Sequence, residues 1–179
     1  LLEHRQVLDL REGVLTRWIR WRDPAGRITR LTQRRFVHLE KVHLAGLQTT
    51  VVAENWTGSL HVRSSVDGTV TNTGVASYRD LTSEHLDPVH AQLLGEDGML
   101  LAARTRQSQV TIVEAARTRL THNGVPVTPP ITPQLEPARV GVRLHVDVTA
   151  GDEIVIDKIV ALTTSRDRAI SEPISAAVD

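Results

Sequence analysis

Apolar and polar residues alternate one by one in several stretches of this chain. In the stretch that begins at Gly58, the residues Leu60, Val62, Ser64 and Val66 fall on one side of an extended backbone, and the residues between them are polar or charged. Side chains along a strand point alternately to the two faces of a sheet. This pattern therefore predicts a half-buried strand that leads into the turn after residue 66.

The same alternation recurs along the chain and is strictest at residues 140–148, where every second residue is Val or Leu. Shorter or less regular apolar runs predict further strands at residues 5–10, 14–23, 27–39, 43–54, 99–106, 109–120 and 153–164. A helical period of 3.6 residues is almost absent.

Turn-forming residues separate the predicted strands. The sequence Asp-Pro-Ala-Gly at residues 23–26 predicts a tight turn, because proline fixes one turn dihedral and glycine accepts a positive one. Residues 14–23 and 27–39 then form a long antiparallel hairpin. Residues 107–108, 122–124 and 150–152 are expected to be turns as well. Strands joined by turns predict an all-β, antiparallel sandwich.

Three segments do not fit this alternation. Residues 74–94 are polar and irregular, which predicts a long surface loop. Residues 125–137 contain five prolines, and proline cannot donate a hydrogen bond to a sheet, so this segment is expected to be irregular or an edge strand. Residues 165–179 are predicted to be a departing linker or the start of a helix.

The composition excludes several classes of function. The 179 residues suit one domain, and 21 basic against 21 acidic residues give zero net charge, which disfavours nucleic acid and anionic membranes as partners. The absence of cysteine excludes disulfides, thiolate metal sites and a cysteine nucleophile, and it is compatible with a cytoplasmic location. No apolar run approaches the ~20 residues that cross a bilayer.

Aromatic residues are few, at 3% of the chain. Trp18, Trp21 and Phe36 lie among seven arginines in the first predicted hairpin, a mixture that also occurs in nucleic-acid-binding proteins. The neutral total charge favours another interpretation, in which the arginines lie on the solvent face of a sheet and their stems cover apolar neighbours.

The polar segment contains His85, Asp87 and His90, three side chains of the kind that bind metals. Pro88 interrupts any helix that would bring both imidazoles to one face, so no metal site is predicted. His85 and Asp87 remain candidates for contact with a substrate, because long polar loops on a rigid sheet often carry function.

No catalytic residue is predicted. Paired carboxylates perform acid and base chemistry in glycoside cleavage, and such pairs occur at residues 84 and 87, 96 and 97, and 152 and 153. Ordinary turn formation explains these pairs better. The chain contains no G-x-S-x-G, H-E-x-x-H or phosphate-binding glycine motif.

Three strings resemble the N-terminal domain of glycoside hydrolase family 65, the family of maltose, trehalose and kojibiose phosphorylases and related α-glucoside hydrolases. They are VLDLREGVLTRWIRWRDPAGRITRLTQRRFVHL at residues 7–39, SVDGTVTN at residues 65–72 and IVALTTSRDRAISEP at residues 159–173. The resemblance spans nearly the whole chain.

This resemblance implies an antiparallel β-super-sandwich of the galactose mutarotase type, incomplete at its N-terminal side. It assigns residues 1–164 to the sandwich and residues 165–179 to the start of a linker toward a missing (α/α)6 catalytic domain. The general-acid glutamate and the phosphate-binding residues of the family belong to that catalytic domain, so none is assigned to this chain.

The activity implied for the parent protein is inverting cleavage of an α-linked disaccharide such as maltose, trehalose or kojibiose by phosphate or water. Inorganic phosphate is the expected co-substrate, and no metal or organic cofactor is expected. The chain alone is expected to be inactive. Its expected partners are its own catalytic domain and a second copy in a homodimer, and the disaccharide is the parent's substrate.

Two other interpretations stay open. A free-standing carbohydrate-binding sandwich would use Trp18, Trp21, Trp56 or Tyr78 as a stacking face. A structural interaction domain would instead leave an apolar patch exposed.

Overall fold

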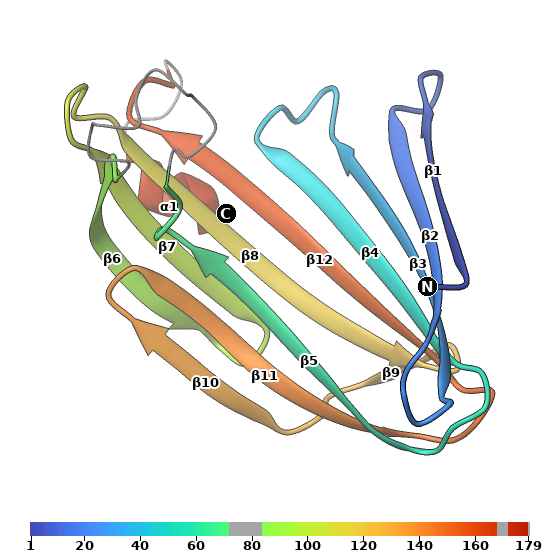
Figure 1. The fold of residues 1–179 in the computed structure, drawn as a ribbon. Helices are drawn as coiled ribbons and strands as arrows, with labels where there is room; N and C mark the ends of the chain where they lie inside the picture. The colour runs from blue at the N-terminus through green and yellow to red at the C-terminus, as the bar shows by residue number, and fades with distance from the viewer. Residues whose placement is uncertain (72–83, 168–171, 179) are drawn as a thin grey trace. The chain divides into compact units, whose positions relative to one another are not determined.

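The computed structural model describes residues 1–71, 84–167 and 172–178, and in these ranges it consists of twelve strands and one short helix (Figure 1). The elements are β1 (Glu3–Asp9), β2 (Val14–Arg22), β3 (Ile28–Val37), β4 (Leu44–Ala53), β5 (Gly58–Asp67), β6 (Leu86–Leu94), β7 (Gly98–Thr105), β8 (Thr111–His122), β9 (Val125–Val127), β10 (Ile131–Glu136), β11 (Arg139–Val148), β12 (Glu153–Thr164) and α1 (Pro173–Val178). The predicted all-β, antiparallel class is confirmed.

The strands belong to two sheets. The larger has nine strands in the order β1-β2-β3-β4-β12-β8-β7-β6, with β9 paired to β8, and the smaller has the order β10-β11-β5. The chain also divides into two compact units. The first comprises Leu1–Val62, Arg117–Ile131 and Leu144–Val160, and the second comprises Arg63–Ala116, Thr132–Arg143 and Ala161–Asp179.

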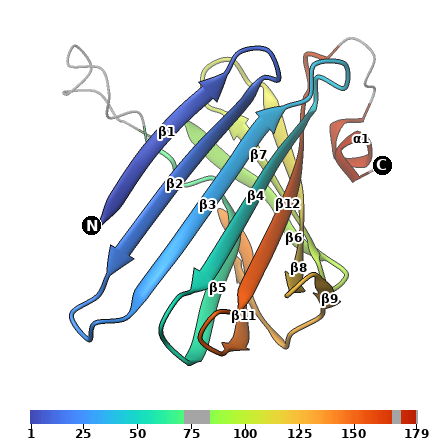
Figure 2. The same ribbon diagram turned by 90° about the vertical axis from the view of Figure 1, so that its right-hand side faces the viewer.

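The first unit contains the meander β1 to β4 (Figure 2). The turn between β2 and β3 forms as predicted: the Asp23 carboxylate accepts hydrogen bonds from the backbone N–H groups of Ala25 and Arg27, at 2.9 and 3.0 Å. Gly26 has a positive φ of 81° there. These residues therefore fix the register of the long hairpin locally.

A second tight turn in this unit joins β8 to β9 at Asn123 and Gly124. Both residues have positive φ, 49° and 78°, and the flanking residues His122 and Val125 are directly paired. Asn-Gly is the favoured pair for such two-residue hairpins. The proline-rich segment that follows lies at sheet edges as predicted, because β9 pairs with β8 alone and β10 is an outer strand of the smaller sheet.

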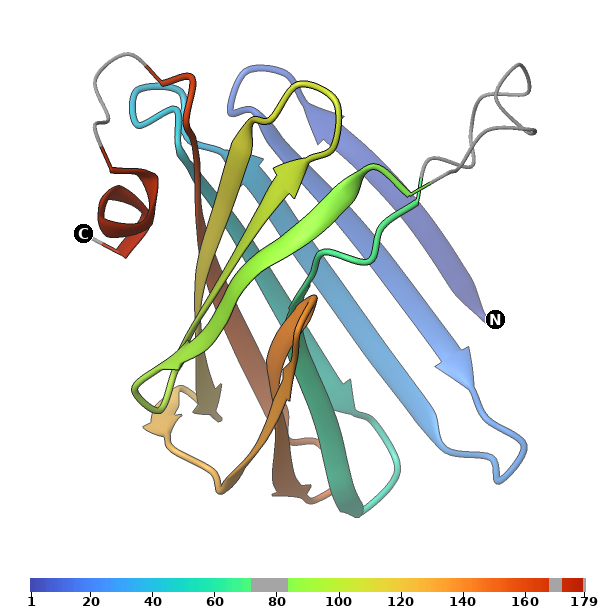
Figure 3. The same ribbon diagram turned by 90° about the vertical axis from the view of Figure 1, so that its left-hand side faces the viewer.

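The core of the second unit lies around β7, whose residues 98–103 are all buried. On one face, Leu100 and Ala102 pack with residues of β8 and with Ala177 and Ile174 of α1. Figure 3 shows this helix as a short red coil. On the other face, Leu101 contacts Gly68 directly after β5. The strand is therefore covered on both faces, as its continuous apolar sequence requires.

The helix α1 is fixed at its start. The Glu172 carboxylate accepts hydrogen bonds from the backbone N–H groups of Ile174 and Ser175, which caps the first turn. The Thr163 hydroxyl, on a residue only 1% exposed, donates to the carbonyl of Pro173 at 2.7 Å. In the described ranges no helix is long and apolar enough to cross a membrane.

The predicted loop at residues 74–94 is wrong in its second half, because residues 86–94 form β6, which pairs with β7. Residues 74–83 lie outside the described part. The strand was hidden by an irregularity: the ladder pairs Pro88 with Ala103 and then His90 with Ala102, so Val89 is an extra residue. Such a bulge shifts the alternation of apolar and polar side chains partway along the strand.

The strand β11 lies very close to its neighbour β5 at Gly141. A Cβ atom at this position would lie 2.5 Å from the carbonyl oxygen of Ser64 and 2.7 Å from Cβ of Ser65. Because one of these atoms belongs to the backbone, the contact cannot be relieved by a side-chain rotation. Only glycine therefore permits the observed spacing of these two strands.

We expect Gly141→Ala to lower the free energy of unfolding by ~1–3 kcal/mol, the usual cost of overpacking, in urea titrations of the chain. Arg143 lies two residues further on the same face of β11 and is exposed. Arg143→Ala is the matched control and should change stability by less than ~0.5 kcal/mol. Equal losses in the two variants would contradict the close-approach argument.

Candidate functional site

The predicted contact residues His85 and Asp87 lie at the start of β6, where Arg106 holds the chain in place. The Arg106 guanidinium donates to Asp87 Oδ1 at 2.8 Å and to the carbonyl of Glu84 at 3.2 Å, and its backbone N–H donates to the carbonyl of His85 at 3.0 Å. The hydrogen bond that Arg106 donates to Asp87, followed by the negative charge of Asp87, raises the pKa of Arg106. Asp87 thus has a structural partner, and contact of His85 and Asp87 with a substrate stays a prediction.

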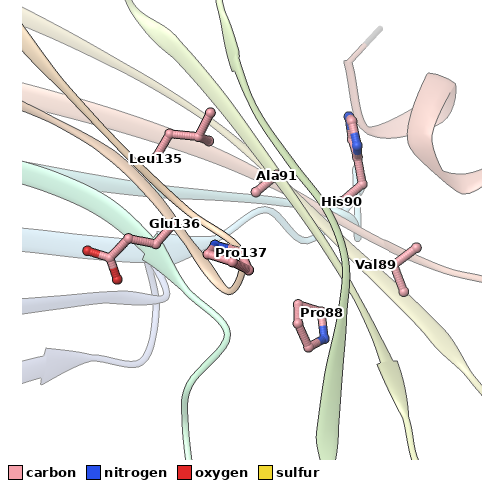
Figure 4. A pocket seen from close by; sticks show the side chains of 7 residues that line it. All are labelled: Pro88, Val89, His90, Ala91, Leu135, Glu136 and Pro137. Atoms are coloured by element: carbon pink, nitrogen blue, oxygen red, sulfur yellow. The ribbon is translucent and has the colours of Figure 1, made fainter.

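A shallow hollow of about 430 Å³ lies further along β6 (Figure 4). Its lining residues are Pro88, Val89, His90, Ala91, Leu135, Glu136 and Pro137. His90 Nε2 lies 3.0 Å from Gln92 Oε1, and the Glu136 carboxylate points away from the imidazole. Among the described residues no group of three or more His, Asp or Glu side chains could hold a metal ion. The hollow therefore lacks convergent polar groups.

The three tryptophans that a carbohydrate-binding face could use do not all lie on one face of the sheet. Trp21 is paired with Thr29, whose hydroxyl accepts a hydrogen bond from Trp56 Nε1 at 3.0 Å. Trp18 is three residues from Trp21 on the same strand and so lies on the opposite face of the sheet. Tyr78 lies outside the described residues. The three indoles therefore do not form one stacking platform.

A more distinctive arrangement lies at one end of the first unit, where Phe36 of β3 faces Gly46 of β4. The ring covers Gly46 so closely that a Cβ there would lie 2.6 Å from Phe36 Cε1. Hollows of about 560 and 350 Å³ adjoin this pair. Gln33 and Arg35 line the first hollow and Arg34 lines the second, so the hollows lie on opposite faces of the sheet.

Large apolar side chains are exposed around these hollows. We call Leu10, Phe36, Val37, Leu39 and Val42 the apolar rim; each is between 43% and 89% exposed. Leu10 lies in the β1–β2 turn, and the others lie on β3 or in the connection to β4. Phe36 and Val37 are consecutive on β3 and so point to opposite faces of the sheet. Exposed large apolar side chains at one end of a sheet are a feature of interaction surfaces.

The larger hollow has a cationic border. Arg17 Nη2 donates to Gln33 Oε1 at 3.2 Å, and Gln33 Nε2 donates to Thr49 Oγ1 at 3.2 Å. These three residues lie opposite one another on β2, β3 and β4. Arg17 Nε is buried and has no hydrogen-bond partner among the described residues. The described contact of its Nη2 group is with the neutral side chain of Gln33.

A polar cluster around Asp152 joins two turns of the first unit. The Asp152 carboxylate accepts hydrogen bonds from Asn123 Nδ2 at 2.8 Å and from the backbone N–H of Thr149 at 2.7 Å, and His122 Nε2 lies 2.9 Å away. Asn123 Oδ1 in turn accepts from the backbone N–H of Glu153. The hydrogen bonds from Asn123, Thr149 and His122, in that order, lower the pKa of Asp152 to about 2.

Comparison with protein families gives one match that spans the chain. The family model for the N-terminal domain of glycosyl hydrolase family 65 matches residues 1–179. An uncharacterized glycosyl hydrolase of Mycobacterium tuberculosis (strain ATCC 25618 / H37Rv) is 40% identical over 169 residues, which are 94% of this chain and 13% of the relative.

Other relatives have named activities. A kojibiose phosphorylase of Halothermothrix orenii is 26% identical over 93% of this chain and 20% of its own length. An α,α-trehalose phosphorylase of Thermoanaerobacter brockii is 25% identical over 93% of this chain and 22% of its own length. The chain thus spans about a fifth or less of the length of these proteins.

A solved structure has the same fold. The putative kojibiose phosphorylase from human microbiome superposes with a TM-score of 0.77 over 98% of this chain and 21% of that chain, at 16% sequence identity. At this identity the match concerns the fold alone.

The sequence interpretation did not single out the apolar rim. The sequence does contain a signal for it. Positions 36, 37, 39, 42 and 44 are all apolar, which is more apolar residues than a strand with one buried face needs. The contact between Phe36 and Gly46 could not be predicted from the sequence, because it depends on the register of β3 against β4.

The low pKa of Asp152 predicts a pH dependence of stability. A carboxyl group whose pKa is lowered by folding stabilises the fold above its ordinary value of 3.8, and this contribution is lost as pH falls toward about 2. We expect Asp152→Asn to make the loss of stability between those values shallower in urea titrations, without removing it, because Asp67 also has a pKa of about 2.

The matched control is Asp147→Asn. Asp147 is exposed on β11 and has no hydrogen-bond partner in the described part of the chain. Its substitution should therefore leave the dependence of the free energy of unfolding on pH unchanged. If the free energy of unfolding of Asp152→Asn falls with pH as steeply as that of the unmodified chain, the polar cluster around Asp152 does not contribute to the pH dependence.

Proposed function

The chain belongs to glycosyl hydrolase family 65, as its N-terminal domain, and from this premise we propose that it supports the catalytic domain of an enzyme that cleaves α-linked glucosyl disaccharides. The observation that carries the proposal is the family match over residues 1–179. Kojibiose and trehalose phosphorylases among the relatives support a disaccharide of the kojibiose, trehalose or maltose type as the substrate of the whole protein.

The reaction proposed for the whole protein is an inverting displacement at the anomeric carbon. A carboxylic acid protonates the glycosidic oxygen, while phosphate attacks the anomeric carbon from the opposite face of the sugar. The bond to the leaving sugar breaks as the bond to phosphate forms, so the products are glucose 1-phosphate and a free sugar. Water in place of phosphate would give hydrolysis. The proposed chemistry needs no metal or organic cofactor.

In this proposal the catalytic groups lie outside the chain. Its described carboxylates support that assignment, because the ones with clearly lowered pKa values are engaged in local structure. Asp67 is bound by Thr69 and Arg139, and Asp152 is bound in its turn cluster. A general acid needs a proton near neutral pH, and a carboxyl group with a pKa of about 2 has lost it.

The apolar rim is the surface that we assign to contact with the catalytic domain. Its side chains are exposed in this chain, and the relatives are about five times longer or more, so the occupant would be part of the same protein. The hollows beside Phe36 provide a concave surface, and among the described residues Arg17 Nε has no hydrogen-bond partner. A second copy of the chain, in a homodimer, is the other partner in this proposal.

We expect the 179-residue chain to show no turnover of kojibiose, trehalose or maltose, with phosphate or without it, because it lacks the catalytic domain. Anion-exchange chromatography would detect glucose 1-phosphate and free glucose. The whole protein, assayed in parallel, should convert at least one of these disaccharides. Turnover by the chain alone would overturn the proposal, and tight binding of a disaccharide by the chain would instead favour a carbohydrate-binding module.

We expect the amides of residues 36–47 to exchange at least ~10-fold more slowly in the whole protein than in the isolated chain, since docking would cover the apolar rim. Phe36→Asp in the whole protein should abolish this difference. Leu135→Asp is the control, because Leu135 is also more than half exposed but lies on β10. Hydrogen exchange followed by mass spectrometry gives the rates, and equal protection in chain and whole protein would rule out docking at the rim.

A further inference from the structure

Two histidines face each other on the outer side of the smaller sheet. His61 lies on β5 and His145 on β11, and these strands are neighbours in that sheet (Figure 1). Their ring centroids are 4.4 Å apart, and the ring planes meet at 84°. Both side chains are exposed, whereas Leu144 and Val146 on either side of His145 are buried. We call the two imidazoles the histidine pair.

The register of the two strands brings the histidine pair together. Gly141 of β11 lies against Ser65 of β5. Four residues further along β11 is His145, and its ring partner His61 is four residues earlier on β5. The two strands therefore run antiparallel, and the histidines are directly opposite each other. Such residues have Cβ atoms ~4.5–5.5 Å apart, so the backbone itself holds the two imidazoles side by side.

The histidine pair differs from the other histidines of the chain. In the described ranges no ring contact joins two other imidazoles. His122 is bound to Asp152, and His38 Nδ1 accepts a hydrogen bond from the backbone N–H of Lys41 at 3.0 Å. Neither ring of the histidine pair has a hydrogen-bond partner among the described residues. Its nitrogens are therefore available to a ligand.

We propose that the histidine pair binds a divalent transition-metal ion such as Ni²⁺, Cu²⁺ or Zn²⁺. Neutral imidazole is the commonest metal ligand in proteins and suits these three ions, whereas Mg²⁺ and Ca²⁺ prefer oxygen ligands. Two imidazole nitrogens that bind one ion at ~2.0–2.1 Å have ring centres ~4.5–5 Å apart. The observed separation of 4.4 Å is close to this value. Because both side chains are exposed, rotation about their own torsions can direct one nitrogen of each ring to the ion.

The neighbouring charges and the number of ligands bear on the affinity. Asp147 and Arg143 are each two residues from His145 on the same exposed face of β11, so a carboxylate that attracts a cation and a guanidinium that repels it flank the site. No group of three or more His, Asp or Glu side chains lies together in the part of the chain that the structure describes, so water fills the remaining positions around the ion. We therefore expect a Kd of only ~10–100 µM.

This ion has no place in the disaccharide cleavage proposed above, which needs no metal. It links β5 to β11, two strands that are far apart in the sequence. The histidine pair comes together only in the folded chain, and a ligand that binds the folded state preferentially stabilises it by mass action. The inference is therefore independent of the proposed catalytic role.

Isothermal titration of the 179-residue chain with NiCl₂ should reveal one site with a Kd of ~10–100 µM. His61→Gln and His145→Gln each keep a polar side chain but remove one imidazole, and each should raise Kd at least ~10-fold. His4→Gln is the matched control, because His4 is exposed on β1 and is not in ring contact with another histidine of the described ranges. It should leave Kd within ~2-fold, and MgCl₂ should not bind.

Two further measurements locate the ion. Ni²⁺ is paramagnetic, so the imidazole NMR signals of His61 and His145 should broaden before that of His4. The midpoint of urea unfolding should rise by ~0.5–1 M in ~1 mM NiCl₂, and by less than ~0.2 M in either variant of the histidine pair. Unfolding without metal checks that these variants fold. Nickel binding with an unchanged Kd in both variants places the ion elsewhere and overturns the proposal, as does the absence of binding up to ~1 mM.

Discussion

Burial of β7 on both faces is the constraint on which the second unit depends. Residues 98–103 are buried in succession, so this strand has no polar face to turn to solvent. One side needs α1, whose Ile174 and Ala177 pack against Leu100 and its neighbours. The other side needs close contact with residues beside β5, and the glycine at position 141 permits β5 and β11 to lie close to each other. The packing of the helix and the core of this unit therefore depend on one apolar run.

Most of the fold could be predicted from the sequence, because local chemistry determines most of its strands and turns. Asp23 and the Asn123–Gly124 pair place their turns without help from distant residues. The strand β6 was missed, because the extra residue Val89 shifts the alternation partway along it. The partner of Asp87 could not be predicted from the sequence either. Arg106 is nineteen residues away, and only the pairing of β6 with β7 brings the two side chains together.

The polar groups of the chain explain why sequence motifs pointed to no reaction. Arg20 binds Glu54 through two nitrogens, Arg139 binds Asp67, and Arg106 binds Asp87 and Glu84. These pairs join segments that are distant in the sequence. The more distinctive surface feature is apolar: the exposed side chains of the rim around Phe36.

The bond between Thr163 and Pro173 has a mechanical consequence. It ties the start of α1 to β12, which lies in the interior of the nine-stranded sheet between β4 and β8. A force applied to the helix would thus be transmitted to a central strand, where neighbours on both sides share the load in shear. An attachment at an edge strand would open the sheet one hydrogen bond at a time. The helix is therefore anchored to an interior strand and not to an edge strand.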